Sequence, residues 1–494
     1  MPDHPCLGLK LMPLAICCLC AGPALAAGPD PLADGELVIE MDRPETGGPD
    51  EILIEDGPYQ APASAEELII DDDAVEDPGM ATGVEAGIAE AEDTGSGRLD
   101  MRIDDVRAEY SHFTRSASEA DHSLYGKISA LANWQPSPTW ELQAAGRLDG
   151  HNQQGSLDYS SVKADYGDSY IRYRGEKLRL TAGTQTVIWG RLDELPLADR
   201  VSTADLTRLI LDDLEDRRRA NPMIRAETFF AAAKLDLVWL VDFRPAELPD
   251  KDSVWYPINR QTGRILGFDP KDVPPAAVQA ATISTDAPGG DGGFGARYTR
   301  THALADFGVT VARTRQSIPY FRSAGPGAIK AEYPRSWSYG LDAAADAAGA
   351  TWRFEILYNS DNPVTRTDLT YTTTPALSWG GGVELHPGDG DTRLNVQVVG
   401  TNLVDAPSII DRKEIYGLNG EIEVPFDRER WRTSLDFYVG LGDKDVYLNP
   451  EVAFLGWEPH ELYLALHYFD GDTQTLGGFH QDHSSVNLGW RARF

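Results

Sequence analysis

The chain has 494 residues, a formal net charge of −34 and a mean hydropathy of −0.35. This acidic excess argues against nucleic acid as a partner, because nucleic-acid binding needs a basic surface. No run of about 20 consecutive apolar residues occurs, which excludes a membrane-spanning helix. A membrane β-barrel is still allowed, since its strands alternate apolar and polar residues and their hydropathy averages out.

Residues 1–27 are predicted to be a cleaved secretory signal. Lys10 precedes an apolar stretch over 11–21, and Ala24-Leu25-Ala26 supplies the small residues of a cleavage site. The apolar stretch is too short to span a membrane. All four cysteines lie at positions 6–20, so the processed protein would cross the oxidising periplasm with no thiol to mispair.

Residues 28–97 are predicted to form a disordered, acidic periplasmic leader. They contain 21 acidic residues against one basic residue, Arg43, and Tyr59 is their one aromatic residue. Such a composition cannot bury enough apolar surface to offset the loss of chain entropy.

The leader contains one pattern three times, with a spacing of 15 and then 16 residues. Each copy places three β-prone aliphatic residues between carboxylates, enough to add a short strand to the sheet edge of a partner. Three copies would raise the local concentration of a periplasmic or inner-membrane partner. Alternatively, the copies are solvated and bind nothing, or they pack loosely on the mouth of the barrel. The docking candidates are Leu37, Val38, Ile39, Ile52, Leu53, Ile54, Leu68, Ile69 and Ile70.

From about residue 98 the sequence alternates with period two, which predicts strands with one apolar and one polar face. In 462–469, for example, Leu462, Leu464 and Leu466 alternate with Tyr463 and His467. Segments of 9 to 11 residues with aromatic residues near their ends favour a lipid-facing barrel over a soluble β-sandwich.

Eighteen candidate strands lie near 99–113, 122–135, 139–150, 160–174, 177–190, 223–231, 233–243, 293–302, 306–315, 336–347, 350–360, 377–386, 391–401, 413–425, 430–442, 445–456, 461–470 and 484–494. The expected fold is therefore an all-β, transmembrane, antiparallel barrel over 98–494. We expect 16 to 18 strands, with 14 as the runner-up, because single-chain bacterial barrels have even strand numbers. Such a barrel has a wide lumen.

The closing strand, 484–494, gives the most specific signal. Its apolar face ends in Trp490 and Phe494, while Asn487, Arg491 and Arg493 point the other way. A final amphipathic strand with a terminal aromatic residue resembles the signal by which barrel-assembly machinery recognises its clients. We therefore expect residence in the lipid of a Gram-negative outer membrane.

Two long insertions, 191–222 and 244–290, interrupt the strands, and long barrel loops are usually functional or extracellular. The first is predicted to hold a short helix, capped by Ser202 or Thr203 and ended by Pro222. Its apolar residues must be buried against something, which favours folding into the lumen over a surface loop. Rings of charge select solutes in pores. The pore-lining or constriction candidates are Arg191, Asp193, Asp212, Asp213, Arg217, Arg218 and Arg219.

The same region carries a resemblance to a family. Val187-Ile188-Trp189-Gly190-Arg191 is followed by the Glu215-Asp216-Arg217 cluster and then by a strand with Pro245 and Pro249 after it. Over about residues 98 to 255 this resembles a family of uncharacterised porin-like bacterial outer-membrane proteins. The resemblance implies a barrel and no particular substrate. The repeated acidic leader departs from the simplest members.

No catalytic constellation is evident: the histidines are scattered and no serine lies in an elbow-like turn. His480 and His483 near Asp482 are expected to lie in an exposed loop rather than in a metal site. No enzyme activity, cofactor or metal is predicted. The expected function is a porin-like channel for a small or medium polar solute. The alternative is a docking component of an envelope export or assembly complex, whose acidic leader binds the partner.

Overall fold

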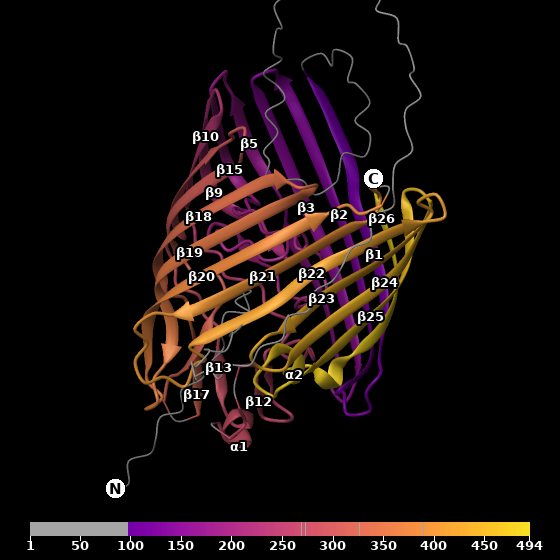
Figure 1. The fold of residues 1–494 in the computed structure, drawn as a ribbon. Helices are drawn as coiled ribbons and strands as arrows, with labels where there is room; N and C mark the ends of the chain where they lie inside the picture. Colours follow the sequence, from indigo (N-terminus) through magenta and orange to yellow (C-terminus); the bar gives the residue numbers. More distant parts are fainter. Residues whose placement is uncertain (1–96, 268, 272, 326, 389) are drawn as a thin grey trace, which may run out of the picture. The chain divides into compact units, whose positions relative to one another are not determined.

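The computed structural model describes residues 97–494 except 268, 272, 326 and 389. Their main sheet is a closed antiparallel barrel (Figure 1). β4 and β5 both pair with β3 and together form one wall strand. The eighteen wall strands are, in order, β1 (Arg98–Phe113), β2 (Ala120–Ser137), β3 (Trp140–Gly155), β4 (Tyr159–Tyr166) with β5 (Ser169–Arg174), β6 (Leu178–Gln185), β9 (Asn221–Phe230), β10 (Ala233–Leu240), β14 (Gly293–Arg300), β15 (Asp306–Arg315), β18 (Arg335–Ala347), β19 (Ala350–Thr365), β20 (Tyr371–Leu385), β21 (Arg393–Leu403), β22 (Glu414–Phe426), β23 (Trp431–Gly440), β24 (Asp445–Trp457), β25 (His460–Gly471) and β26 (Ser485–Arg493).

Each wall strand pairs with its neighbours in chain order, and β26 closes the barrel against β1. In that closing pair Asp105 lies opposite Arg493, and Phe113 lies opposite Ser485. Closure leaves no sheet edge with unpaired backbone groups, which a bilayer requires. The expected barrel is confirmed, with the strand number at the upper end of the predicted range. Residues 1–96, including the predicted signal and the nine docking candidates, lie outside the described residues.

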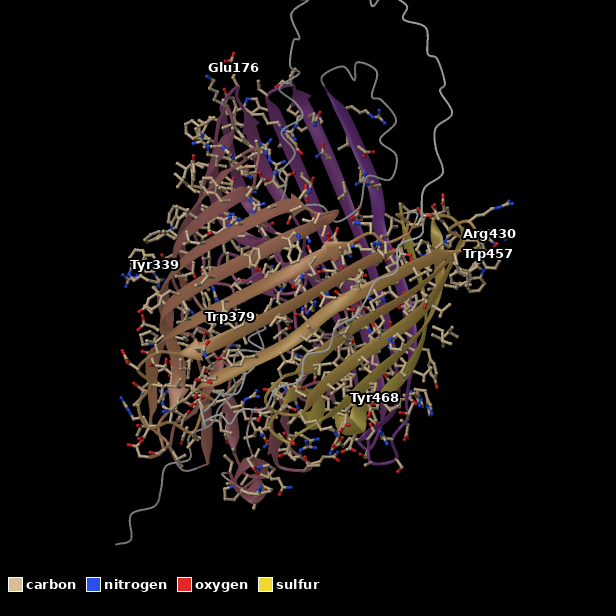
Figure 2. All side chains as sticks on the ribbon, viewed as in Figure 1. Glu176, Tyr339, Trp379, Arg430, Trp457 and Tyr468 are labelled. Carbon is tan, nitrogen blue, oxygen red and sulfur yellow. The ribbon has the colours of Figure 1, made fainter. Side chains whose placement is uncertain are left out.

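The two faces of the wall differ as the alternation predicted. In β25, Leu464 is 53% exposed on the outside, whereas Tyr463 and His467 are buried on the inside. Aromatic side chains such as Tyr339 and Trp457 project outward from the wall (Figure 2). An apolar outer face with aromatic residues around a polar interior is the pattern of a transmembrane barrel.

The two ends of the barrel have connections of different lengths. One end carries both ends of the barrel sequence and tight turns such as 138–139, 231–232 and 348–349. Ala348 and Gly349 both have positive φ, as a two-residue hairpin turn requires. The other end carries the long connections 186–220, 241–292 and 316–334. In outer-membrane barrels short turns face the periplasm and long loops face outward.

The loops at this second end form a cap with its own hydrophobic core. The cap comprises residues 241–292, 316–334 and 472–484. Its core contains Phe243, Ile258, Phe321 and Phe479. Its elements are β11 (Ile258–Asn259), β12 (Arg264–Ile265), α1 (Pro275–Gln279), β13 (Thr282–Ser284), β16 (Tyr320–Ser323), β17 (Ala328–Glu332), α2 (Leu476–Phe479) and η1 (Gln481–His483). None of the helices within the described ranges is long and apolar enough to cross a membrane.

The prediction of a helix within 191–222 is wrong. The connection between β6 and β9, residues 186–220, consists of turns and a small hairpin of β7 (Thr203–Ala204) and β8 (Arg218–Arg219). Leu209 has a φ of 59°, which interrupts a right-handed helix. The short helices of the structure, α1 and α2, lie in other connections. We call residues 186–220 the lumen segment.

Candidate functional site

The lumen segment crosses the interior of the barrel and contacts opposite sides of the wall. It leaves β6 and returns to β9, the fifth and sixth wall strands. Its residues pair with side chains of β1, the first wall strand, and of β18 and β19, the tenth and eleventh. In a ring of eighteen strands the first and tenth face each other. The segment therefore bridges the lumen.

The first contact lies on β19, where Glu355 is 3% exposed. Its carboxylate accepts backbone N–H groups of Leu192 at 2.8 Å, Leu197 at 2.7 Å and Ala198 at 3.1 Å, and one from Arg191. Several N–H groups that converge on one anion form an anion-binding nest.

Two ion pairs flank this contact. Arg191 Nε lies 2.6 Å from Oδ1 of Asp342 on β18, whose other oxygen is 2.7 Å from Arg297. Asp193 accepts a hydrogen bond from Arg353 at 3.0 Å and one from Asn395 at 2.6 Å. Through these contacts the three wall strands β18, β19 and β21 hold residues 191–198.

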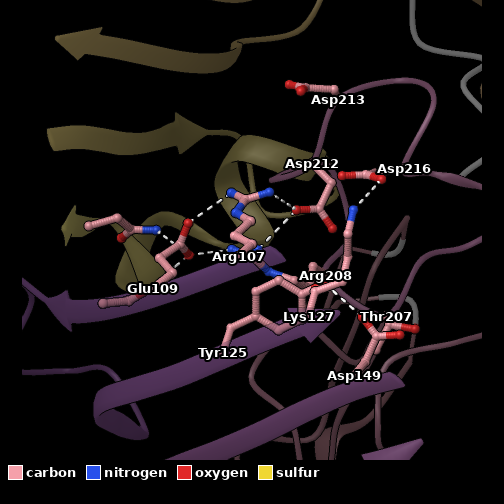
Figure 3. A network of polar contacts seen from close by, with 12 residues as sticks. Arg107, Glu109, Tyr125, Lys127, Asp149, Thr207, Arg208, Asp212, Asp213 and Asp216 are labelled. Carbon is pink, nitrogen blue, oxygen red and sulfur yellow. Dashed lines mark hydrogen bonds and ion pairs between the residues drawn. The ribbon is translucent and has the colours of Figure 1, made fainter. Parts of the chain in front are cut away.

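The second contact lies on β1, where Arg208 binds Glu109 (Figure 3). Arg208 also lies 3.0 Å from Asp212, and Arg107 lies 2.9 Å from Asp212 and 2.8 Å from Glu109. The guanidinium of Arg208 stands over the ring of Tyr125, 4.0 Å from its centre, a favourable cation–π arrangement. Buried charges are tolerated when they are paired in this way.

Further pairs extend this contact along β2 and β3. Lys127 Nζ lies 2.6 Å from Asp216 and 2.5 Å from Asp105. Arg147 lies 2.9 Å from Asp205. The lumen segment therefore presents carboxylates to basic wall residues on this side.

The seven predicted pore-lining residues all lie in this segment, and the structure shows what each contacts. Arg191, Asp193 and Asp212 pair with the wall as described above. The remaining pairs are Arg217 with Glu194 at 3.6 Å, Arg218 with Asp199 at 2.9 Å, Arg219 with Asp165 at 2.9 Å and Glu247 at 3.0 Å, and Asp213 with Arg493 at 3.4 Å. The side chain of Asp213 is 65% exposed, the most of the seven. Their pore-lining role stays a prediction.

Carboxylates gather where the segment faces β22 to β24. Asp436 on β23 interacts electrostatically with Glu194 and Asp213 of the segment and with the wall residues Glu421 and Glu451. All five are at least partly exposed to solvent. By contrast, Arg191, Arg208 and Arg218, on other sides of the segment, are buried. We call this partly exposed, acidic side of the segment the hydrated side.

Sequence reasoning missed the wall residues of the site. Glu109, Glu355 and Asp436 lie on the inward face of their strands, which the alternation identifies. The signal available was a charged residue at an inward position. A local sequence pattern cannot show which segment of the chain such a charged residue would contact.

A separate polar cluster lies under the cap. His480 Nδ1 lies 3.0 Å from His483 Nδ1, and His483 Nε2 lies 2.8 Å from Glu119. Burial together with the neighbouring His483 lowers the pKa of His480 well below its usual range. Burial opposes ionisation of Glu119, but hydrogen bonds from His483 and Asn259 lower its pKa to about 2.

Both histidines are buried against Trp255, contrary to the expectation of an exposed loop. Within the ranges that the structure describes, no group of three or more His, Cys, Asp or Glu side chains is placed to hold a metal ion.

The model of one protein family matches residues 93–476. The chain belongs to this family, described as "Protein of unknown function (DUF1302)". That the Trp-Gly motif marks this family stays a prediction. No curated protein matches the chain.

Several solved structures match the chain at low identity and with TM-scores below 0.5. Salmonella typhi OmpF in complex with daunomycin is 10% identical, with a TM-score of 0.41 over 81% of this chain and 98% of that chain. A mutant of the Rh. blastica porin is 8% identical, with a TM-score of 0.37 over 80% and 100%. Wzi of Escherichia coli, described as a carbohydrate-binding β-barrel involved in group 1 capsule assembly, is 11% identical, with a TM-score of 0.40 over 79% and 85%.

Proposed function

We propose that the protein is a porin-like channel that passes a small or medium polar solute across the Gram-negative outer membrane. The observation that carries this proposal is the lumen segment, which bridges opposite walls across the polar interior of a closed barrel. A barrel of eighteen strands is wide enough for solutes when its lumen is not filled. The proposal includes no catalytic step and no cofactor.

The exposed charges on the hydrated side suggest which solutes are favoured. Asp436 of the wall forms no ion pair among the described residues and lies within electrostatic range of Glu194, Asp213, Glu421 and Glu451, each of which is paired with an arginine. Rings of Asp and Glu side chains attract cations and exclude anions in pores. A cation or a cationic polar solute is therefore the favoured cargo.

Planar-bilayer recording of the purified protein tests the proposal. We expect discrete conductance steps and a reversal potential in a salt gradient that indicates preference for cations. A purified barrel that shows neither conductance nor flux of small solutes into liposomes would refute the channel function.

Deletion of residues 28–97 separates the channel from the alternative of a docking component. If the barrel is the channel, the conductance survives this deletion. If the leader docks to an envelope partner, the deletion produces a cellular phenotype while conductance in bilayers is unchanged. If both conductance and phenotype survive, the docking role fails.

A further inference from the structure

The loop that surrounds Glu355 closes around a single wall carboxylate. Oε1 accepts the N–H groups of Arg191 and Leu192, and Oε2 accepts those of Leu197 and Ala198. Among the described residues no cation forms an ion pair with Glu355. Peptide N–H groups alone meet its two oxygens, and when the carboxylate is ionised each of these hydrogen bonds is about twice as strong as a neutral one.

Trp189 and Gly190, the Trp-Gly pair of the sequence, both position the loop that surrounds Glu355. Trp189 Nε1 donates to Asp236 on β10 at 3.2 Å, so the chain enters the lumen at a fixed place. Gly190 has a φ of +131°, and a Cβ there would lie 2.7 Å from Oε1 of Glu355 and 2.6 Å from Pro196. Glycine is needed because no other residue lets the backbone approach the carboxylate this closely.

We propose that Glu355 is the positioning residue of the lumen segment. Its carboxylate fixes where residues 191–198 stand against β19. Its effect on the width of the passage rests on the proposed channel function. The opposite contact, centred on Glu109 and Arg208, shares no residue with this one. Weakening Glu355 therefore loosens the loop 191–198, which the ion pairs of Arg191 and Asp193 still tie to the wall, and leaves the opposite contact unchanged.

Glu355→Gln is the sharpest test because it keeps the size of the side chain. The amide NH₂ would replace one oxygen and face two N–H donors, so two charge-assisted hydrogen bonds are lost. Glu461→Gln is the matched control. Glu461 pairs with Arg432 and Arg491, each at 2.6 Å, from wall strand to wall strand, and does not touch the segment.

The readout is the rate at which a maleimide labels a cysteine introduced by Ala198→Cys. Ala198 is 3% exposed. The four native cysteines, at positions 6–20, are replaced by alanine. We expect Glu355→Gln to raise the labelling rate at least about tenfold, and Glu461→Gln to leave it within about twofold. Heat-modifiable gel migration verifies that each barrel is folded.

Gly190→Ala provides a second variant that keeps Glu355 itself, and it should also increase labelling because the added Cβ displaces the loop from the carboxylate. An unchanged labelling rate in folded Glu355→Gln overturns the positioning role. Single-channel conductance is recorded on the same proteins, and an increase for Glu355→Gln but not for Glu461→Gln supports the effect on passage width. A lack of conductance in the unsubstituted barrel refutes the channel function but leaves the labelling result valid.

Discussion

Replacing Arg208 by methionine should destabilise the folded barrel by about 3 kcal/mol. The side chain of Arg208 is 6% exposed and lies between the carboxylates of Glu109 and Asp212, over the ring of Tyr125. Methionine keeps much of the apolar length and removes the charge.

The magnitude follows from the contacts that are lost and those that remain. At an effective dielectric constant of about 20, two unit charges 3 Å apart attract by roughly 5 kcal/mol. Arg208 makes two such attractions, to Glu109 and Asp212. Part of this energy is offset by the cost of removing the arginine charge from water, a cost that methionine does not have. Glu109 and Asp212 each keep Arg107, at 2.8 Å and 2.9 Å. The cost should therefore lie at the lower end of the roughly 3–5 kcal/mol found when a buried ion pair loses one partner.

Urea unfolding of the barrel in lipid vesicles, followed by tryptophan fluorescence, measures the change in the free energy of unfolding. Arg493→Met is the control, because Arg493 and its partner Asp213 are 56% and 65% exposed and 3.4 Å apart. Exposed pairs contribute at most about 1 kcal/mol. If both substitutions cost the same, the network around Glu109 does not hold the segment as described.

Three further results are expected. Asp213→Asn together with Asp436→Asn should lower the cation preference measured by reversal potential, because two carboxylates leave the hydrated side of the lumen; an unchanged reversal potential would place the passage elsewhere. The cap should become more sensitive to protease as the pH falls. An opened cap lets His480 take up a proton below about pH 6.5, which the folded cap resists. Glu119, with its pKa of about 2, adds stability above about pH 4.5 that is lost between pH 4.5 and 2. His480→Asn should flatten the change between pH 7 and 5, and an equally steep change in that variant would exclude His480 as its source. Finally, Phe494→Ala should reduce the fraction of heat-modifiable barrel in outer membranes, whereas a normal fraction would show that the terminal aromatic ring is not part of the assembly signal.

The barrel was predictable because the sequence of each wall strand shows the alternation of apolar and polar residues by itself. A wall strand faces lipid on one side and a polar interior on the other, so period-two alternation is imposed on every strand separately. Leu464 and its buried neighbour Tyr463 illustrate this, and all eighteen predicted segments correspond to wall strands.

The path of the lumen segment was not predictable for the opposite reason. Its apolar residues have helical spacing, yet Leu206 packs under the cap with Ile318 while Leu209 packs with Trp255 and Phe469. A helix would present both leucines on one face. Charged residues on several wall strands, far away in the sequence, hold the segment on an irregular path instead. A local sequence pattern contains no information about these partners.

The network around Glu109 also spans the seam where the sheet closes on itself. Glu109 lies on the first strand and accepts hydrogen bonds from Tyr463 on β25, at 2.6 Å, and from Asn487 on β26, at 3.0 Å. Arg208 completes the set from the middle of the chain. These four side chains can meet only after the last strand has joined the first. The lumen segment and the barrel wall must therefore reach their final form together, because one network joins the first strand, the middle and the last two strands of the barrel sequence.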